Sequence, residues 1–376
     1  MKHFLLSLAL LAGIVHAAEP VVSHTIPEWL VLAEQGDPAA VNTVIDAYNK
    51  NEIREANYTA TLKLFLKIAE QGSLKAQLIV GMMYSRGQGA TKDETEAAKW
   101  FLKASAQGDA FAQGHMGLRY AIGSGVPQDV DGGLALLRKS SAQKEPNSAH
   151  VLGLIYSGGK LVPVDHAAAF GWFLQAADNG YLEAQLKLGQ IYSAGQGVPK
   201  DYAAAAEWYH KAAALGSADA ELQLGVMYAQ GQGMTQDYVA ARAWYGKAAE
   251  HGSSTAMLNL GELTAEGKGG PQDFKRAGEW YGSAVELLDT RAMYNLAQLL
   301  TTGKKDVAKD EVGALALLYL AVQTNDESAL AIYQKELDQL AARLTSQQIA
   351  DAKVSSRSLE KNIQMKRYLK DKKRKG

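Results

Sequence analysis

The stretch SADAELQLGVMYAQGQGMTQDYVAARAWYGKAAEHG, residues 217–252, is one complete copy of the unit from which most of this chain is built. Its first part predicts a helix whose apolar residues recur at matching places elsewhere: Ala220, Leu222, Leu224 and Tyr228. Ser217 stands before this run and can cap the helix, because its hydroxyl can accept a backbone N–H of the first turn. Gly231 can end the helix in a left-handed turn.

The second part of the copy predicts another helix. Asp237 can cap its start, and Gly252 ends it. An apolar stripe follows one face of this helix and is formed by Ala241, Trp244, Tyr245 and Ala248. Each copy is therefore expected to be a helix, a seven-residue loop and an antiparallel helix.

The same pattern repeats with a period of 36 residues. Ungapped copies occupy residues 73–108, 109–144, 145–180, 181–216, 217–252 and 253–288, and a weaker first copy occupies residues 37–72. An eighth copy, residues 289–326, slips by one residue and places its loop acid at Asp310. We expect residues 26–36 to form a leading half-repeat, residues 37–326 a solenoid and residues 327–360 C-terminal capping helices.

Three residue types recur at fixed places in the copies. Glycine inside a helix costs about 1 kcal/mol relative to Ala, so its recurrence predicts that a neighbouring helix comes close at Gly81, Gly117, Gly153, Gly189, Gly225 and Gly261. Loop acids are expected to cap the second helices at Asp93, Asp129, Asp165, Asp201, Asp237 and Asp273. A tryptophan stripe is expected to interlock in the core and consists of Trp100, Trp172, Trp208, Trp244 and Trp280.

The N-terminus has the pattern of an export signal. Lys2 and His3 precede an uncharged apolar run from Phe4 to Val15, and small residues follow it, which predicts cleavage after Ala17 or Ala18. We therefore expect residues 1–18 to be removed and the mature protein to lie in the periplasm or outside the cell. Because the chain has no Cys, a lipid anchor on cysteine is not expected.

The C-terminal end differs in charge from the rest of the chain. Residues 361–376 carry eight Lys or Arg and one Asp, and removing this +7 from the formal net charge of −1 leaves −8 on residues 1–360. Contact with an anionic polymer or a membrane is one interpretation of this basic tail, and a solvated tail is the other. The first interpretation rests on Lys366, Arg367, Lys370, Lys372, Lys373, Arg374 and Lys375.

The pattern A-x-x-x-L-G-x-M-Y-x-x-G-x-G-V-x-x-D-Y-x-x-A-x-x-W-Y-x-K-A-A-x-x-G resembles the SEL-one-like repeat family, a branch of the tetratricopeptide-type helical repeats. Residues 181–252 match it nearly position by position, and residues 37–326 match it more weakly. Residues 344–354, LTSQQIADAKV, resemble the helix that often closes such arrays. The resemblance implies an all-α fold, a right-handed α/α superhelical solenoid of about eight repeats. It also implies an interaction scaffold of the kind used in envelope assembly, polysaccharide export, stress signalling and host contact.

No set of residues suits catalysis, a cofactor or a metal ion. The histidines after the predicted signal form no metal-binding motif, and no two of them stand four residues apart: His24, His115, His150, His166, His210 and His251. Two Ser-x-x-Lys strings, at 141–144 and 358–361, lack the partner motifs of a serine enzyme, and Ser141 is expected on a solvated surface. We therefore expect no enzyme activity, no cofactor and no metal site.

One face of the first helices varies between copies. It consists of the third, seventh, tenth and fourteenth positions, opposite the recurrent Ala, Leu and Gly, and the resemblance places it on the concave side. The early copies supply Ile79, Met82, Phe111, His115, Leu118, Ile122, Val151 and Leu154. The later copies supply Glu183, Gln190, Asp219, Gln223, Asn259, Glu262 and Glu266. We predict that this face binds an amphipathic segment with a basic end, unless neighbouring helices cover its apolar half.

These observations favour a non-enzymatic protein-protein interaction scaffold or adaptor of the cell envelope, with a partner protein or peptide on the concave face. The alternative is a cell-wall or surface-polymer binding protein that uses the basic tail. Nucleic acid is not expected as a partner.

Overall fold

The computed structural model describes residues 25–323 and 329–375, so the predicted signal segment at residues 1–18 lies outside it. The described chain forms two compact units. The smaller unit comprises residues 25–112 and 124–127, and the larger unit comprises residues 113–123 and the described residues from 128 onward. Throughout these ranges the regular structure is helical, apart from one isolated backbone pair between Lys304 and Val307. None of these helices combines the length and apolar character that would let it cross a membrane.

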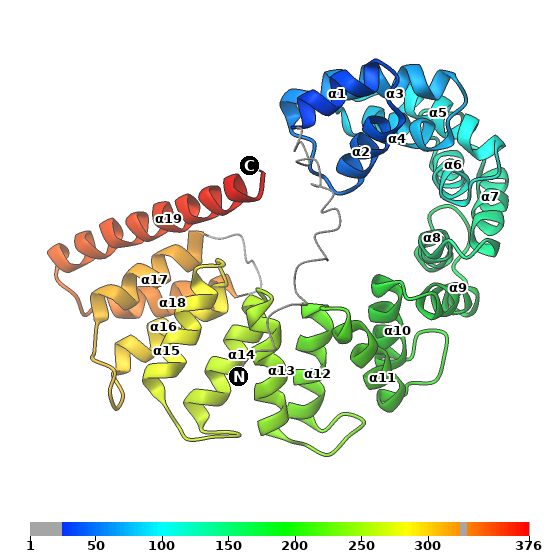
Figure 1. The fold of residues 1–376 in the computed structure, drawn as a ribbon. Coiled ribbons are helices and arrows are strands. Elements are labelled where there is room, and N and C mark those ends of the chain that lie inside the picture. The colour runs from blue at the N-terminus through cyan, green and yellow to red at the C-terminus, as the bar shows by residue number, and fades with distance from the viewer. Residues whose placement is uncertain (1–24, 324–328, 376) are drawn as a thin grey trace, which may run out of the picture. The chain divides into compact units, whose positions relative to one another are not determined.

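The predicted all-α fold of helix-loop-helix repeats is confirmed (Figure 1). The smaller unit contains α1 (Ile26–Glu34), α2 (Pro38–Asn49), the short 3-10 helix η1 (Glu55–Asn57), α3 (Tyr58–Glu70), α4 (Leu74–Arg86) and α5 (Glu94–Ala106). Helix α6 (Ala110–Ile122) begins in the smaller unit and continues in the larger one. The larger unit contains α7 (Val130–Ala142), α8 (Pro146–Gly158), α9 (His166–Asp178), α10 (Leu182–Ala194), α11 (Tyr202–Ala214), α12 (Ala218–Gln230), α13 (Tyr238–Glu250), α14 (Ser254–Glu266), α15 (Phe274–Val285), α16 (Thr290–Thr302), α17 (Glu311–Gln323), α18 (Leu330–Ala341) and α19 (Ser346–Lys375).

First and second helices alternate along the larger unit. The first helices α8, α10, α12 and α14 each pack against the helix that follows, and α9, α11 and α13 also pack against the next first helix. Within this unit, α8 and α10 lie on the inner side of the curve, and α9 and α11 lie on its outer side (Figure 1). The variable face of the first helices can therefore line the inner side.

Loop acids start the second helices, as predicted. The side chains of Asp93, Asp129, Asp165, Asp201, Asp237 and Asp273 each accept a backbone N–H from the first turn at 2.8–3.0 Å. Asp310 does the same for α17 at 2.8 Å. Because the first N–H groups of a helix have no partner within the helix, these carboxylates satisfy donors that would otherwise depend on water.

The recurrent glycines of the first helices lie against the second helix of the same repeat. A Cβ on Gly225 would stand 2.4 Å from Cδ1 of Tyr245, and a Cβ on Gly81 would stand 3.0 Å from the ring of Phe101. Gly153, Gly189 and Gly261 meet Phe173, Tyr209 and Tyr281 in the same way, and Gly117 meets the backbone of Gly133 and the side chain of Leu137. The predicted close approach is confirmed, and an aromatic ring accounts for it in five of the six repeats.

The tryptophan stripe is less buried than predicted. Trp100 and Trp208 are buried, whereas Trp172, Trp244 and Trp280 are only partly buried. The fully enclosed aromatic residue is the one that follows each tryptophan, and it contacts the glycine. Trp244 packs instead against the core of the preceding repeat, and the ammonium group of Lys247 covers its ring at 4.1 Å. The tryptophans thus connect successive repeats, and the next residue connects the two helices of one repeat.

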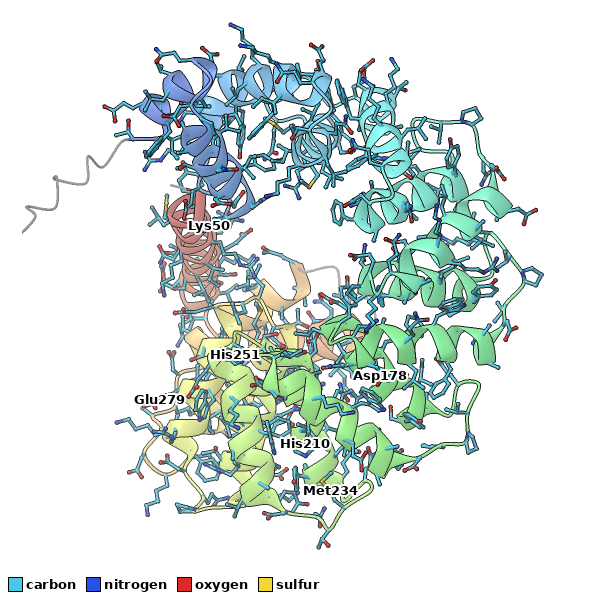
Figure 2. All side chains as sticks on the ribbon, turned by 45° about the vertical axis from the view of Figure 1, so that its right-hand side comes forward. Lys50, Asp178, His210, Met234, His251 and Glu279 are labelled. Atoms are coloured by element: carbon cyan, nitrogen blue, oxygen red, sulfur yellow. The ribbon has the colours of Figure 1, made fainter. Side chains whose placement is uncertain are left out.

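A polar pair closes several repeats between the start of the first helix and the end of the second. Gln107 donates to Gln77 at 2.8 Å, and Gln143 donates to Gln113 at 2.8 Å. In the copy 217–252 the pair is ionisable, because Nδ1 of His251 lies 2.7 Å from Oε2 of the buried Glu221. His251 is labelled in Figure 2. The pairing is not general, because in the copy 181–216 the buried Gln185 stands opposite Leu215 and its amide oxygen has no hydrogen-bond partner.

The C-terminal helix α19 packs against α17 through its buried Ala352 and Ile363. It runs without a break across residues 360 and 361, so the predicted boundary between capping helices and basic tail falls inside one helix. Two residues of the predicted tail contact the body of the larger unit: Lys366 pairs with Glu286, and Arg367 donates to the carbonyl oxygen of Leu287 at 2.7 Å.

The expectation of a solvated Ser141 is wrong. Ser141 is 1% exposed. It lies near the C-terminal end of α7, on the side of the helix that packs into the interior. Ser358 of the other Ser-x-x-Lys string is exposed on α19.

Candidate partner-binding surface

The predicted partner-binding residues lie on six first helices. Helices α4 and α6 carry Ile79, Met82, Phe111, His115, Leu118 and Ile122, and α8 carries Val151 and Leu154. Helices α10, α12 and α14 carry Glu183, Gln190, Asp219, Gln223, Asn259, Glu262 and Glu266. Residues 79, 82 and 111 belong to the smaller unit and all the others to the larger unit, so the predicted surface is divided between the two.

Ile79 does not belong to this surface. It is 2% exposed and lies in the core of the smaller unit, so the expectation that it faces a partner is wrong. Its position on α4 explains this, because Ala76 and Met83 stand three residues before and four residues after it and are both fully buried. Met82 also packs partly against this core.

Two apolar residues of the predicted surface are open to solvent. Ile122 is 52% exposed and Leu154 is 46% exposed, and they lie on the successive first helices α6 and α8. Phe111, His115, Leu118 and Val151 are partly buried. Covering by neighbouring helices therefore applies to Ile79 and in part to five other residues, but not to Ile122 and Leu154.

The polar residues of α10, α12 and α14 lie at the surface. Glu183, Gln190, Asp219 and Glu266 are exposed, and Gln223, Asn259 and Glu262 are half-buried. Burial raises the pKa of Tyr245 to about 12, and the side chain of Asn259, on the variable face, lowers it in part.

A cavity of about 340 Å³ opens between α14, α15 and α16 of the larger unit. Two predicted residues, Glu262 and Glu266, line it. The other lining residues are Ala265, Phe274, Tyr281, Asn295, Gln298, Leu299, Thr302 and Lys304. This volume is at the small end of ligand-binding pockets and suits one large side chain better than a dinucleotide-sized cofactor.

The residues that sequence reasoning missed follow the same positional rule. Asn295, Gln298 and Thr302 are the seventh, tenth and fourteenth residues of the copy that begins at Asp289, and all three line the cavity. The surface residues predicted from the sequence extend only as far as the copy 253–288. The same spacing of i, i+4, i+7 and i+11, applied to the copy that begins at Asp289, would have identified these three residues. It applies there because the one-residue slip of that copy comes after the end of α16.

Two carboxylates, a neutral phenol and the ammonium group of Lys304 set the electrostatics of the cavity, and this ammonium lies 5.9 Å from the centre of the Phe274 ring. Burial raises the pKa of Tyr281, and the nearby carboxylates of Glu262 and Glu266 raise it further, so the hydroxyl stays protonated. Oε1 of Glu262 accepts from Nδ2 of Asn295 at 3.1 Å and lies 3.7 Å from Arg291. Glu266 pairs with Lys268 at 2.7 Å, and both side chains are about half exposed. Exposed ion pairs of this kind contribute little to stability, so an incoming cation can replace them.

Across residues 25–323 and 329–375, no three His, Asp or Glu side chains come together as a possible metal site. The features present are apolar contact at Ile122 and Leu154, amides, and carboxylates at the cavity.

Antiparallel helix pairs that stack through interlocking aromatic side chains, with a variable face on the first helices, define a tetratricopeptide-type helical solenoid. The Sel1 repeat model matches residues 53–73, 74–109, 110–145, 146–181, 182–217, 218–253, 254–287 and 290–335. The chain therefore belongs to the Sel1 repeat family. Repeats of this family generally mediate protein-protein interactions, and their scaffolds are typically non-catalytic.

Two solved structures resemble the chain over most of its length. One is c5321, a protective antigen of uropathogenic Escherichia coli with the Sel1-like repeat fold, at 29% identity and a TM-score of 0.68 over 89% of this chain and 72% of that one. The other is a Sel1 repeat protein from Oxalobacter formigenes, at 27% identity and a TM-score of 0.62 over 86% of this chain and 98% of that one. No curated protein sequence matched the chain.

Proposed function

We propose that this protein is a non-enzymatic scaffold or adaptor of the cell envelope that binds a partner protein or peptide on the variable face of the larger unit. The cavity between α14, α15 and α16 carries this proposal, because it lies at the positions where the repeats differ and is large enough for one side chain. Its two carboxylates and its aromatic lining favour a Lys or Arg side chain of the partner. The exposed Ile122 and Leu154 lie on α6 and α8, at least three copies from the cavity, and offer apolar contact to a separate part of a larger partner.

A peptide-display selection on the full mature chain tests this function. We expect enriched peptides to combine a Lys or Arg with apolar residues at helical spacing. The double variant Glu262→Gln/Glu266→Gln should weaken their binding about tenfold, because the two lost charge-assisted contacts together remove about 1.4 kcal/mol. The matched control is Glu207→Gln/Glu250→Gln, which makes the same charge change at exposed positions of the second helices α11 and α13.

Two outcomes would contradict the proposal. One is equal binding of the selected peptides to both double variants. The other is a photo-crosslinker that captures the peptides as well from position 207 as from position 298, which lines the cavity. Either result would place the binding surface outside the variable face.

The envelope location rests on residues 1–18, whose apolar run and small-residue end suit an exported chain. N-terminal sequencing of the protein from fractionated cells should show a start at Ala18 or Glu19. A chain that retains Met1 and stays in the cytoplasm would exclude export.

A further inference from the structure

Helix α19 carries an apolar cluster near its C-terminal end that nothing in the larger unit covers. Met365 is 57% exposed, Tyr368 is 61% exposed and Leu369 is 49% exposed. Their spacing of i, i+3 and i+4 places them on one face of the helix. Large apolar side chains that gather at one exposed place usually mark a contact surface.

This cluster faces away from the body of the larger unit. The opposite face of α19 carries the buried Ile363 and the two residues that contact the end of α15, Lys366 and Arg367. These contacts hold α19 against the end of α15 at the same turns of the helix that carry Met365, Tyr368 and Leu369. Met365, Tyr368 and Leu369 are therefore presented to solvent on an anchored helix.

Positive charge surrounds the apolar cluster. Lys361 is exposed one turn before Met365. After Leu369 the sequence adds Lys370, Lys372, Lys373, Arg374 and Lys375 against Asp371 alone. Basic residues are attracted to an anionic bilayer, and apolar side chains with an aromatic ring partition into the boundary between headgroups and acyl chains.

We propose that this end of α19 is a peripheral membrane-binding element that lies on a bilayer containing anionic lipids. A soluble polyanion would need only the cations and would leave three large apolar side chains exposed to water. A bilayer surface uses both features, because the lysines and arginines meet the phosphate groups while Met365, Tyr368 and Leu369 enter the interface. This element acts independently of the partner-binding face on the first helices.

Vesicle co-sedimentation of the full mature chain tests the proposal. We expect binding to vesicles of phosphatidylglycerol and phosphatidylcholine, weaker binding as salt rises, and little binding to phosphatidylcholine alone. The variant Met365→Ser/Tyr368→Ser/Leu369→Ser should bind the anionic vesicles at least about tenfold more weakly, since the interfacial burial of three apolar side chains is lost. Val354→Ser is the matched control, because Val354 is 64% exposed on α19 but lies away from the basic end.

A triple serine variant that binds anionic vesicles as well as the wild type would overturn the proposal. The contact would then depend on charge alone, as expected for a surface polymer. Equal binding to neutral and anionic vesicles would also overturn it. The substituted side chains are exposed, so the helical circular dichroism of the variant should match that of the wild type and exclude unfolding as the cause.

Discussion

The first and second helices of one repeat use glycine differently. In the first helix α12, a Cβ on Gly225 would stand 2.4 Å from the ring of Tyr245, whereas in the second helix α13 a Cβ on Gly246 would meet nothing within 4 Å. Both residues lie inside a helix, with helical residues before and after them in the sequence. The difference teaches that recurrence separates the two cases: the glycine found in copy after copy marks an interhelical contact, and the other occupies open space.

The largest expected effect is that of Gly225→Ala. Tyr245 is 4% exposed and cannot move aside freely, so the added methyl should lower the free energy of unfolding by about 3 kcal/mol. Urea unfolding followed by circular dichroism measures this change. A decrease in the free energy of unfolding below about 0.5 kcal/mol would mean that the Tyr245 ring shifts at little cost. Close packing would then not distinguish Gly225 from Gly246.

Tyr245→Phe sharpens the comparison by keeping the ring and removing the hydroxyl. Burial raises the pKa of Tyr245 to about 12, against about 10 in the unfolded chain. Because the folded pKa is the higher one, this stabilising contribution is present below pH 10 and is lost as the pH rises from 10 to 12. From pH 9 to pH 11 the wild type should therefore lose about 1.4 kcal/mol more than the variant.

Parallel urea titrations of both proteins at pH 9, 10 and 11 give this difference. Identical pH dependence would show that the hydroxyl reaches water in the folded state.

Asp237→Ala extends the comparison to the start of the second helix. The side chain accepts two backbone N–H groups at 2.8 and 3.0 Å, so its loss should cost about 1 kcal/mol. Asp237→Asn keeps an acceptor oxygen and serves as the control, with an expected loss of a few tenths of a kcal/mol. Hydrogen exchange should show faster opening in the first turn of α13. Equal stability of the two variants would exclude capping as the role of this residue.

The smallest expected effect is that of Gly246→Ala, and its sign is opposite to that of Gly225→Ala. The methyl group meets no atom and the helix interior favours Ala, so the free energy of unfolding should rise by about 0.7 kcal/mol. The same urea titration measures it. Destabilisation here would show that the open space is occupied in solution, for example by a second copy.

Much of the fold could be predicted because the same residue types recur at the same positions of successive copies. The period gave the helix pairs, and the loop acids and the glycines gave the helix boundaries and the close contacts. The identity of the interlocking ring was missed, since Trp244 and Tyr245 are adjacent and both apolar. Only packing shows that Tyr245 meets the glycine of its own repeat while Trp244 reaches the preceding repeat.

The candidate site was less predictable, because variation between copies does not measure exposure. Ile79 varies and is nevertheless buried, since the seventh position lies at the edge of the packed face, where the local neighbours decide its burial. The cavity could not be foreseen because it depends on the loop that carries Lys304, which no other copy repeats. The continuous α19 was also missed, because a run of lysines is compatible with a helix as well as with a solvated tail.

The polar pair that closes the repeats limits how such a chain can change by recombination. Glu221 and His251 lie at the two ends of one copy, so duplication or deletion of a whole copy carries both partners together. An exchange between neighbouring copies with its breakpoint in the loop at 231–237 would instead place Glu221 opposite Leu287. A buried carboxylate without a partner is strongly destabilising. Unequal crossover in the loop of the copy 217–252 should therefore be selected against, whereas crossover at the ends of this copy should be tolerated.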